Sequence, residues 1–373
     1  MTFCMLGISL LTIPPTKMLK LQVQKPRRRT KLVQVGNLAI GGKEPIRVQT
    51  MLSVPTQDVS ACFKQARNCL AAGAELIRLS VADKQDLQAF AKLKLKLGKQ
   101  VPLVADIHYS AELALEALAV ADKIRINPGN FPRAKFVALL KEAKRLKKPL
   151  RIGLNRGSVT GKAPSIPQLV KLTLGYLEVC REQHFDQVIV SIKSAEPLEL
   201  IEANRALVCK LDQAKMFYPL HLGLTEAGAG ESARVKSDLA LGTLLLDGIG
   251  DTIRVSLTED PVAEVSAAYQ LLQATGRRIT QTEFIACPTC GRTKYDLMKL
   301  LTELKIKFPN YPGLKIAVMG CVVNGLGEAR DADWAFVGGK PGLVNLYRKH
   351  KLIRKDLLER QAVSALREEI GKS

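Results

Sequence analysis

Short apolar runs rich in Val, Ile and Leu recur from Val33 to about Gly276, and each is followed by a polar turn and a longer segment of helical periodicity. Runs of this length, bounded by turn residues, are typical of buried strands, and strands that alternate with helices indicate a parallel sheet. The eight runs begin near Ile46, Leu76, Pro102, Lys123, Pro149, Gln187, Pro219 and Thr252. Eight such units favour a (β/α)8 TIM-type barrel over an open sheet.

The helical segments carry their own start signals and apolar faces. Ser110 precedes the apolar segment Ala111 to Val120, and Asp260 with Pro261 supplies an N-cap followed by proline at the first helical position. Cys62 and Cys69 fall on an apolar helical face and are predicted to lie in the core. Cys180 and Cys209 have no cysteine companions, so both are expected to pack as small hydrophobic side chains.

Polar residues occur where the predicted strands end, which is where (β/α)8 barrels carry their chemistry. Five of them are cations, and like charges that converge cost energy unless an anion offsets them. The ligand is therefore expected to carry several negative charges, as a diphosphate does, although each cation alone fits a packing role equally well. The cations are Arg78, Arg125, Arg151, Lys193 and Arg254, and the other strand-end residues are Gln49, Asp106, His108, Asn127, Asn155, Thr225, Glu226 and Ser256. The glycine-rich turn from Thr225 to Gly230 is of a kind that holds phosphate through backbone N–H groups.

Three cysteines and one glutamate near the C-terminal end indicate a metal site. Cys287 and Cys290 form a C-x-x-C pair, Cys321 follows at a distance, and Glu328 lies seven positions beyond it. Zinc prefers four Cys or His ligands, and no fourth accompanies these three thiols. An iron–sulfur cluster accepts thiolates and tolerates one substituted corner, which Glu328 could occupy. A redox C-x-x-C pair with an unrelated buried Cys321 is the alternative.

The amino-acid composition limits which binding partners and which cellular compartment we expect for the protein. The formal net charge of +21 favours an anionic partner, but aromatic residues interleaved with Lys and Arg, as nucleic-acid binders use them, are scarce. We therefore expect no nucleic acid. The first apolar stretch is shorter than a membrane span and lacks a preceding basic region, and eight cysteines without a secretory signal point to a reducing compartment. A cytoplasmic protein that does not enter membranes is predicted.

The chain is expected to comprise four parts. An N-terminal extension and basic arm (1–32) precede the barrel (33–276), a linker (277–284) follows it, and a small α+β domain (285–373) carries the cysteines.

The motifs ACPTC (286–290) and GCVVNGLGEA (320–329) resemble the signature of 4-hydroxy-3-methylbut-2-enyl diphosphate synthases, iron–sulfur enzymes of the methylerythritol phosphate route to isoprenoids. VGNLAIGGKEPIRVQTM, PLVADIH, RINPGN, PLHLGLTEAG and GIGDTIRVSL are also similar to family motifs, so the resemblance covers about residues 33–350. The family usually has proline where this chain has Leu326. The absence of a large insert resembles the compact two-domain bacterial type.

The resemblance implies one 4Fe-4S cluster per subunit, held by Cys287, Cys290, Cys321 and Glu328. It implies that the cyclic diphosphate is bound by Arg78, Arg125, Asn127, Arg151, Asn155, Lys193, Thr225, Arg254, Ser256 and Asn324. Asp106, His108 and Glu226 are the predicted catalytic residues, with Glu226 as candidate general acid. A homodimer and an acidic electron donor, flavodoxin or ferredoxin, are also implied.

Two other classes of protein remain open on the residues alone. A zinc-containing, basic nucleic-acid-binding protein would explain the charge and the C-x-x-C pair. A barrel aldolase or phosphosugar-binding enzyme with a structural metal would use Lys193 as a Schiff base.

Overall fold

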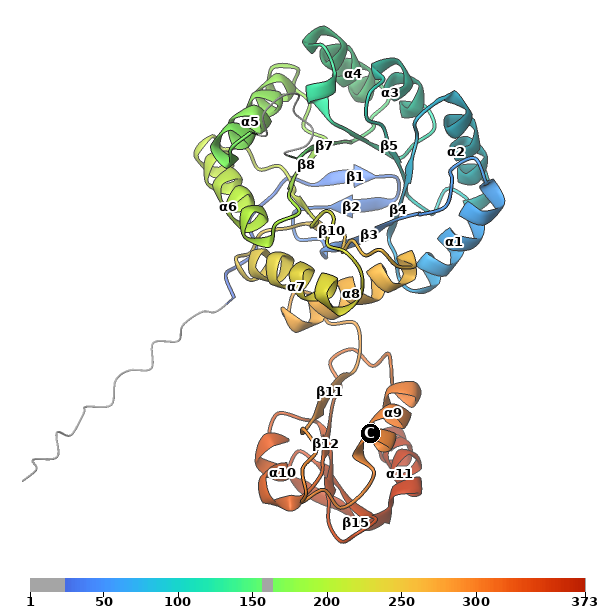
Figure 1. Cartoon of the computed structure of the whole chain (residues 1–373), viewed down its shortest axis with the longest axis vertical. Helices are drawn as coiled ribbons and strands as arrows, with labels where there is room; N and C mark the ends of the chain where they lie inside the picture. The colour runs from blue at the N-terminus through green and yellow to red at the C-terminus, as the bar shows by residue number, and fades with distance from the viewer. Residues whose placement is uncertain (1–23, 156–163, 373) are drawn as a thin grey trace, which may run out of the picture.

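The structure is a computed structural model that describes residues 24–155 and 164–372 of the chain. Its N-terminal part is a closed barrel of eight parallel strands surrounded by helices (Figure 1). The strands are β3 (Arg47–Met51), β4 (Leu76–Ser80), β5 (Leu103–Asp106), β6 (Lys123–Ile126), β7 (Leu150–Asn155), β8 (Val188–Lys193), β9 (His221–Leu222) and β10 (Thr252–Ile253). They are hydrogen-bonded in the order β8-β7-β6-β5-β4-β3-β10-β9, and a parallel bridge between Val190 and Leu220 closes the ring. The predicted (β/α)8 barrel is confirmed.

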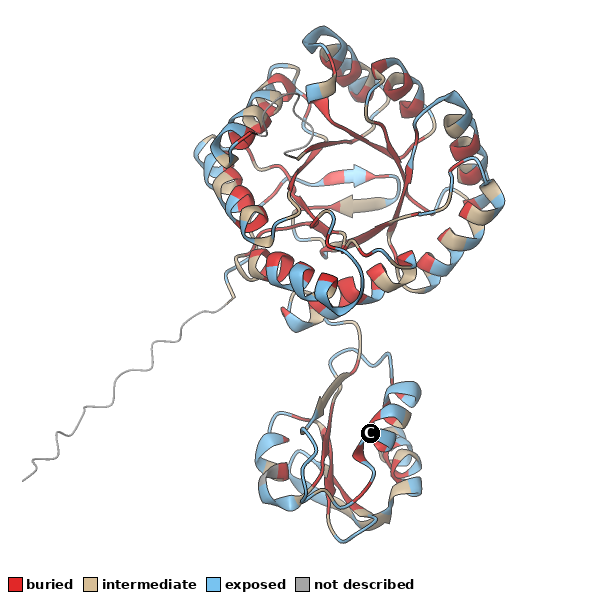
Figure 2. Cartoon of the chain, in the orientation of Figure 1, coloured by how far each residue is buried: buried red, intermediate tan, exposed pale blue. Residues whose placement is uncertain are grey.

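The helices that follow the strands cover the barrel. They are α1 (Val59–Ala71), α2 (Lys84–Leu97), α3 (Ala111–Leu118), a 3-10 turn η1 (Pro128–Asn130), α4 (Arg133–Arg145), α5 (Ile166–Glu182), α6 (Pro197–Gln213), α7 (Gly230–Leu246) and α8 (Pro261–Ala274). Figure 2 shows their buried faces turned toward the strands. The predicted caps form, because Ser110 Oγ accepts from Leu113 N at 3.1 Å and Asp260 Oδ1 from Val262 N at 2.8 Å.

The lone cysteines differ in their environments. Cys62, Cys69 and Cys180 are fully buried, as predicted. Burial raises the pKa of Cys62 to about 11, so that thiol is protonated and inert at neutral pH. The prediction for Cys209 was wrong, because its side chain is exposed on α6. Leu207 and Leu211 of this helix are buried, and a residue midway between them in sequence lies on the opposite face.

A hairpin that the sequence pattern did not predict lies at the N-terminal end of the barrel. Strands β1 (Val33–Val35) and β2 (Leu38–Ile40) pair antiparallel. Their apolar side chains pack against Leu76, Val104 and Ile189, which lie near the starts of three barrel strands. Figure 1 shows the hairpin lying across the ring of strands. The hairpin therefore plugs the end opposite the strand C-termini.

The basic arm is bound to the barrel. Arg27 forms an ion pair of 2.7 Å with Asp251, which precedes β10, and Arg28 forms one of 2.8 Å with Asp212 near the end of α6. Much of this N-terminal positive charge is therefore matched by carboxylates of the barrel itself.

The C-terminal domain is a five-stranded mixed sheet with helices on both faces. Its strands are β11 (Glu283–Ala286), β12 (Lys315–Met319), β13 (Trp334–Gly338), β14 (Leu343–Arg348) and β15 (Lys351–Leu358), and its helices are α9 (Leu297–Lys307), α10 (Val322–Glu328) and α11 (Glu359–Gly371). The first three strands are parallel and the last two pairings are antiparallel. One face packs on α9 and α11, and the other packs against Leu326 of α10. A small α+β domain follows the barrel, as predicted.

The connection between the domains is held at both ends. Arg278 donates to the backbone oxygen of Ile46 at 3.1 Å and to Glu75 at 2.6 Å, and both partners lie just before barrel strands. The chain therefore leaves the barrel from the end opposite the strand C-termini. Thr282 N already bonds to Pro309 O in the next domain, and β11 begins at Glu283, inside the segment predicted as linker. No helix in the described ranges is long and apolar enough to cross a membrane.

Candidate active site

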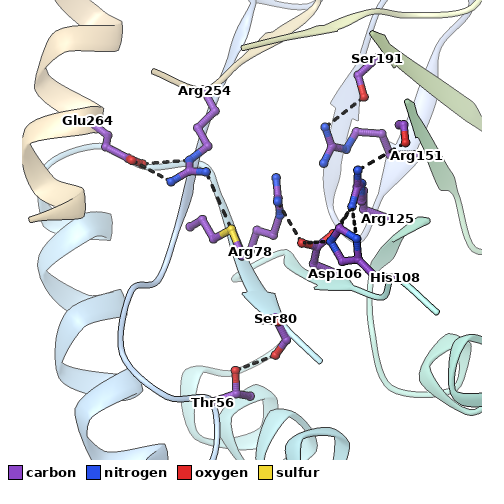
Figure 3. A network of polar contacts seen from close by, with 12 residues as sticks. Thr56, Arg78, Ser80, Asp106, His108, Arg125, Arg151, Ser191, Arg254 and Glu264 are labelled. Atoms are coloured by element: carbon purple, nitrogen blue, oxygen red, sulfur yellow. Dashed lines mark hydrogen bonds and ion pairs between the residues drawn. The ribbon is translucent and has the colours of Figure 1, made fainter. Parts of the chain in front are cut away.

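A buried ion-pair cluster forms the centre of the barrel site. Asp106, on β5, accepts from Arg78 Nη2 at 2.9 Å and from Arg125 Nη1 at 3.3 Å (Figure 3). Burial raises the pKa of the Asp106 carboxyl, but Arg78, His108 and Arg125 together outweigh burial and hold it well below its usual range. Asp106 is thus a permanent anion that fixes two guanidinium groups on neighbouring strands.

His108 lies at the half-exposed edge of this cluster. Its Nε2 is 2.7 Å from Arg125 Nη1 and 3.3 Å from Asp106 Oδ2. One ring nitrogen cannot accept from a guanidinium and donate to a carboxylate at the same time, and guanidinium is a donor only. The tautomer of the ring decides which of the two contacts is a hydrogen bond. His108 is held in place by Arg125 and keeps one side toward solvent.

Arg254 is held by a carboxylate that the sequence pattern did not single out. Its Nε and Nη2 donate to the two oxygens of Glu264 at 3.0 and 2.7 Å. Glu264 comes from the first turn of α8, is buried, and also accepts from Thr50 Oγ1 at 2.8 Å. The bidentate pair fixes the plane of the Arg254 guanidinium.

Arg151 and Lys193 have no carboxylate partner among the described residues. Arg151 is almost fully buried, and its Nη1 donates to Ser191 Oγ at 3.2 Å. Burial lowers the pKa of Lys193 well below its ordinary value, and the guanidinium groups of Arg151 and Arg78 lower it further. Both side chains are therefore positioned to gain from an anion.

Two glycines on barrel strands make room for these cation heads. A Cβ at Gly153 on β7 would lie 2.9 Å from Arg125 Nε, and one at Gly223, just beyond β9, would lie 2.7 Å from Lys193 Nζ. Real Cβ atoms do not approach other heavy atoms so closely, so any side chain at either position would displace a cation. Glycine at Gly153 and Gly223 thus allows the cations to gather inside the barrel.

A second polar layer lies deeper in the barrel, and of its residues the strand-end pattern predicted only Gln49. Lys123 Nζ donates to Gln49 Oε1 at 3.3 Å, and His221 Nδ1 contacts Thr252 Oγ1 at 2.9 Å. All four side chains are buried. Lys123 occupies the first position of β6, two residues before Arg125, so the period of two could have placed it on the same inward face.

Several buried donors in this interior have no hydrogen-bond partner among the residues that the structure describes. They are Gln49 Nε2, Arg78 Nε and Nη1, Arg125 Nε and Arg151 Nε. Buried polar groups are normally hydrogen-bonded, so a set of unpartnered N–H groups on converging cations indicates a polyanion site. Arg78, Arg125 and Arg151 lie within β4, β6 and β7, whereas Lys193 is the last residue of β8 and Arg254 follows β10.

The loop after β9 carries the candidate acid. Glu226 is exposed and has φ of 56°, a left-handed conformation that is uncommon for non-glycine residues and often marks functional loops. The predicted phosphate cradle is partly occupied by the protein, because Gly230 N donates to Glu259 Oε1 at 2.8 Å. The N-terminus of α7 is therefore already capped by a carboxylate.

The remaining predicted substrate residues lie on the same strand ends. Asn127 follows β6 and is buried, with its side-chain oxygen accepting from Gly129 N at 3.2 Å. Asn155 is the last residue of β7. Thr225 and Ser256 are half-buried beyond β9 and β10. The side chain of Asn324, in α10, lies outside the described part of the chain.

In the C-terminal domain two cysteines leave the sheet at one edge. Cys287 follows β11 and Cys321 follows β12, and these strands are parallel neighbours in which Ala286 pairs with Val318. Gly320 N donates to Cys287 Sγ at 3.2 Å, a contact that stabilises a thiolate. Glycine at Gly320 is required, because a Cβ there would lie 2.7 Å from Thr293 Oγ1.

Cys290 is exposed in the loop that follows Cys287, and Glu328 is exposed at the end of α10. Hydrogen bonds from the Arg292 backbone and side chain lower the pKa of the Cys290 thiol, and Arg292 also interacts electrostatically with Cys321. Within the described ranges, no three His, Cys, Asp or Glu side chains are close enough to hold a single metal ion. Ligands of an iron–sulfur cluster each bind a different iron and stand further apart. The two strand ends, the N–H···S bond and the basic neighbour fit such a cluster.

These features define an enzyme class: a (β/α)8 barrel with an anion site at the strand C-termini, joined to a cysteine-bearing α+β domain. The GcpE TIM-barrel domain model matches residues 30–269, and the GcpE protein C-terminal domain model matches residues 283–372. The chain belongs to the GcpE family.

Its relatives bear one enzyme name. The chain is 40% identical over 375 residues to the 4-hydroxy-3-methylbut-2-en-1-yl diphosphate synthase (ferredoxin) of Synechococcus sp. (strain JA-3-3Ab), with 91% of this chain and 90% of the relative covered. It is 38% identical over 387 residues to the enzyme of the same name from Microcystis aeruginosa, with 95% of each covered.

The barrel is also similar to a solved structure of another enzyme. The dihydropteroate synthase of Stenotrophomonas maltophilia aligns with a TM-score of 0.51 at 14% identity, over 66% of this chain and 98% of that one. At that identity the likeness concerns the fold alone.

Proposed function

We propose that this protein catalyses the reductive ring opening and dehydration of 2-C-methyl-D-erythritol 2,4-cyclodiphosphate to (E)-4-hydroxy-3-methylbut-2-enyl diphosphate. Membership of the GcpE family and the names of the relatives support this assignment. The observation that carries it in the structure is the set of buried cations whose N–H groups have no partner among the described residues, in a chain whose Cys287 and Cys321 also follow two neighbouring strands of one sheet. The first feature suits a diphosphate and the second suits an electron carrier.

The barrel cations bind the diphosphate and stabilise charge on the departing phosphate oxygen. Arg78, Arg125 and Arg254 are already oriented by Asp106 and Glu264, so little reorganisation is needed when the ligand arrives. Arg151 and Lys193, which lack carboxylate partners among the described residues, supply further positive charge. Asn127, Asn155, Thr225 and Ser256 complete the polar rim, and the family resemblance adds Asn324 to the residues proposed to bind substrate.

Cys287, Cys290, Cys321 and Glu328 would hold a 4Fe-4S cluster, one in each subunit. When bound, the cluster supplies two electrons singly, which no side chain can do. The lowered pKa of Cys290 and the Gly320 N–H bond to Cys287 both favour thiolates, the form that ligates iron. Leu326 packs on the sheet within α10, so apolar contact anchors the segment that presents Glu328.

Glu226 delivers the proton to the leaving hydroxyl. It is exposed on the loop that follows β9 and is held in a strained backbone conformation, which fixes its direction. Asp106 stays ionised and positions Arg78 and Arg125, while His108 orients the substrate from the rim. This division assigns each predicted catalytic residue a separate task.

The active form is a homodimer in which each C-terminal domain covers the barrel of the partner. Arg278 holds the chain at the barrel end opposite the anion site, and Figure 1 shows the C-terminal domain outside the ring of helices. Val322 and Val323 of α10 are exposed beside the cysteine loops, and Tyr109 is exposed beside His108. Apolar residues exposed at both sites suit a contact between subunits.

Ferredoxin is the proposed electron donor, because the relatives' names contain it. A net charge of +21 suits an acidic donor. We propose that the reaction takes place in the cytoplasm.

Anaerobic purification followed by turnover tests the proposal. We expect a brown protein with about four irons per chain, and conversion of the cyclodiphosphate when reduced ferredoxin is added. A colourless protein with one zinc, or an iron-replete protein that binds the cyclodiphosphate without converting it, would contradict the assignment. Matched preparations of Glu226→Gln should bind the ligand but turn over slowly.

A further inference from the structure

Gln49, on β3, is a buried amide that none of the proposed roles uses. The next residue, Thr50, bonds to Glu264 of the surrounding helix α8 at 2.8 Å, so the alternation of the strand directs Gln49 into the barrel. The side chain is 1% exposed, and its Oε1 accepts from Lys123 Nζ at 3.3 Å. Its Nε2 is also buried and has no hydrogen-bond partner among the described residues. A buried N–H group without an acceptor costs free energy, so this nitrogen calls for a ligand atom that can accept.

Lys123 determines which end of the Gln49 carboxamide is left free. The oxygen and nitrogen of a side-chain amide are alike in shape, so the bonds around them decide its orientation. Because Lys123 donates, the oxygen of Gln49 faces the lysine, and both N–H groups of Nε2 lie on the other side of the planar amide. A lysine amine donates to an amide oxygen in either protonation state. The orientation of Gln49 therefore does not depend on the charge of Lys123.

The position of Gln49 in the sheet brings it among the cations of the site. Strand β3 lies between β4, which carries one of these cations, and β10. Val48 is in register with Ile253, so the next residues along the two strands, Gln49 and Arg254, are level with each other. Met51, two positions further along β3, lies with its sulfur 3.8 Å from Arg254 Nη1. A neutral donor here can bind an anion without adding to the repulsion among the cations.

We propose that Gln49 is a further substrate-binding residue, whose Nε2 donates to an anionic oxygen of the bound diphosphate. Lys123 is a positioning residue that keeps this nitrogen turned away from itself and toward the ligand. The inference rests on the proposed function, because the ligand concerned is the cyclodiphosphate.

Calorimetric titration of the anaerobic holoenzyme with the cyclodiphosphate, without reductant, tests this. Gln49→Met keeps most of the side-chain volume but removes the donor, and should weaken binding about tenfold or more. Gln187→Met is the matched control, because Gln187 lies at the hairpin end of the barrel, where its Oε1 accepts from Gln34 N at 3.1 Å. That control should bind as the wild type does. Equal affinity of Gln49→Met and wild type would overturn the inference, whereas a wild-type protein that does not bind would refute the proposed function.

Gln49→Glu separates ligand binding from mere support of Lys123, and also serves if Gln49→Met does not fold. The glutamate gives the buried lysine a carboxylate partner, so the ligand-free melting temperature should hold or rise. Affinity should nevertheless fall further than in Gln49→Met, because an anion replaces the donor. Affinity equal to that of the wild type would mean that Gln49 only supports Lys123, and would overturn the inference.

A double-mutant cycle tests the positioning role of Lys123. Lys123→Met releases the amide of Gln49, so adding Gln49→Met to that variant should weaken binding less than it does in the wild type. Lys123→Gln can still donate to Gln49 Oε1 and should restore the full effect. The same loss of affinity in the Lys123→Met and wild-type backgrounds would show that Lys123 does not orient Gln49.

Discussion

The barrel site and the cysteine edge, by which we mean the sheet edge where Cys287 and Cys321 follow β11 and β12 together with the neighbouring Cys290, differ in how much of each is preassembled by contacts within the protein. In the barrel, Arg78, Arg125 and Arg254 are fixed by buried carboxylates before any ligand arrives. In the C-terminal domain, Cys290 and Glu328 are exposed. Among the described residues, no three His, Cys, Asp or Glu side chains lie close enough together to bind one metal ion. The contrast teaches that the fold itself orients the cations of the proposed anion site, whereas the cysteines that would hold the proposed cluster are not drawn together by the protein's own contacts.

The largest expected effect separates these two regions. Cys321→Ala should lower the activity by at least about a thousandfold and lower the iron content, because a proposed cluster ligand is lost. Affinity of the barrel for the cyclodiphosphate should change less than about twofold. Glu328→Ala provides the comparison: its activity should fall far more than its iron content, since three thiolates remain. Iron analysis and calorimetry on the same preparations measure both quantities. Equal cluster loss in the two variants would mean that Glu328 is structural.

A second, smaller effect distinguishes two kinds of cation within the barrel. Arg254→Met leaves the buried Glu264 carboxylate without a positively charged partner and should lower the free energy of unfolding by about 3 kcal/mol. Lys193→Met removes a buried cation that has no carboxylate partner among the described residues, so the ligand-free melting temperature should hold or rise. Both variants should bind the diphosphate more weakly. Thermal unfolding with and without the ligand gives both values. A large loss of stability in Lys193→Met would show that this lysine is a packing group.

The smallest expected effect concerns the glycines whose missing side chains leave room for the charged ends of Arg125 and Lys193. Gly153→Ala places a methyl group where Arg125 Nε lies 2.9 Å away, and should weaken diphosphate binding about tenfold by displacing the guanidinium. Gly175→Ala is the matched control, because a Cβ there meets nothing within 4 Å and the residue lies inside α5. That control should leave affinity unchanged and stabilise the helix by up to about 1 kcal/mol. Equal affinities in the two variants would mean that Arg125 adapts without cost.

The sequence predicted most of the barrel because its signals are local. The strand-forming runs, the Ser110 and Asp260 caps and the inward cations all follow from neighbouring residues. What it missed depends on tertiary contact. The β1–β2 hairpin became meaningful only as a plug for the barrel end, and Glu264 looked like an ordinary residue of a helical first turn. Lys123 was passed over because only strand ends were considered, and Cys209 was misplaced because a lone cysteine carries no signal of helix face.

For the cysteine edge, the sequence predicted which residues take part but not how they are arranged in space. The spacing of Cys287, Cys290 and Cys321 indicates a metal-binding set, but sequence does not show that Cys287 and Cys321 follow neighbouring parallel strands. Nor does it show that Glu259 already caps α7 where a phosphate cradle was expected. Both facts depend on how distant segments meet.

The central claim is that a preassembled barrel site works with a cysteine domain delivered by the partner subunit, and subunit mixing tests it most directly. Glu226→Gln and Cys287→Ala are each expected to be nearly inactive. After exchange, half of the dimers contain both chains, and one of their two sites pairs an intact barrel with an intact cluster. The mixture should therefore recover about a quarter of the wild-type activity. A mixture that remains inactive after exchange has been demonstrated would show that each C-terminal domain serves its own barrel.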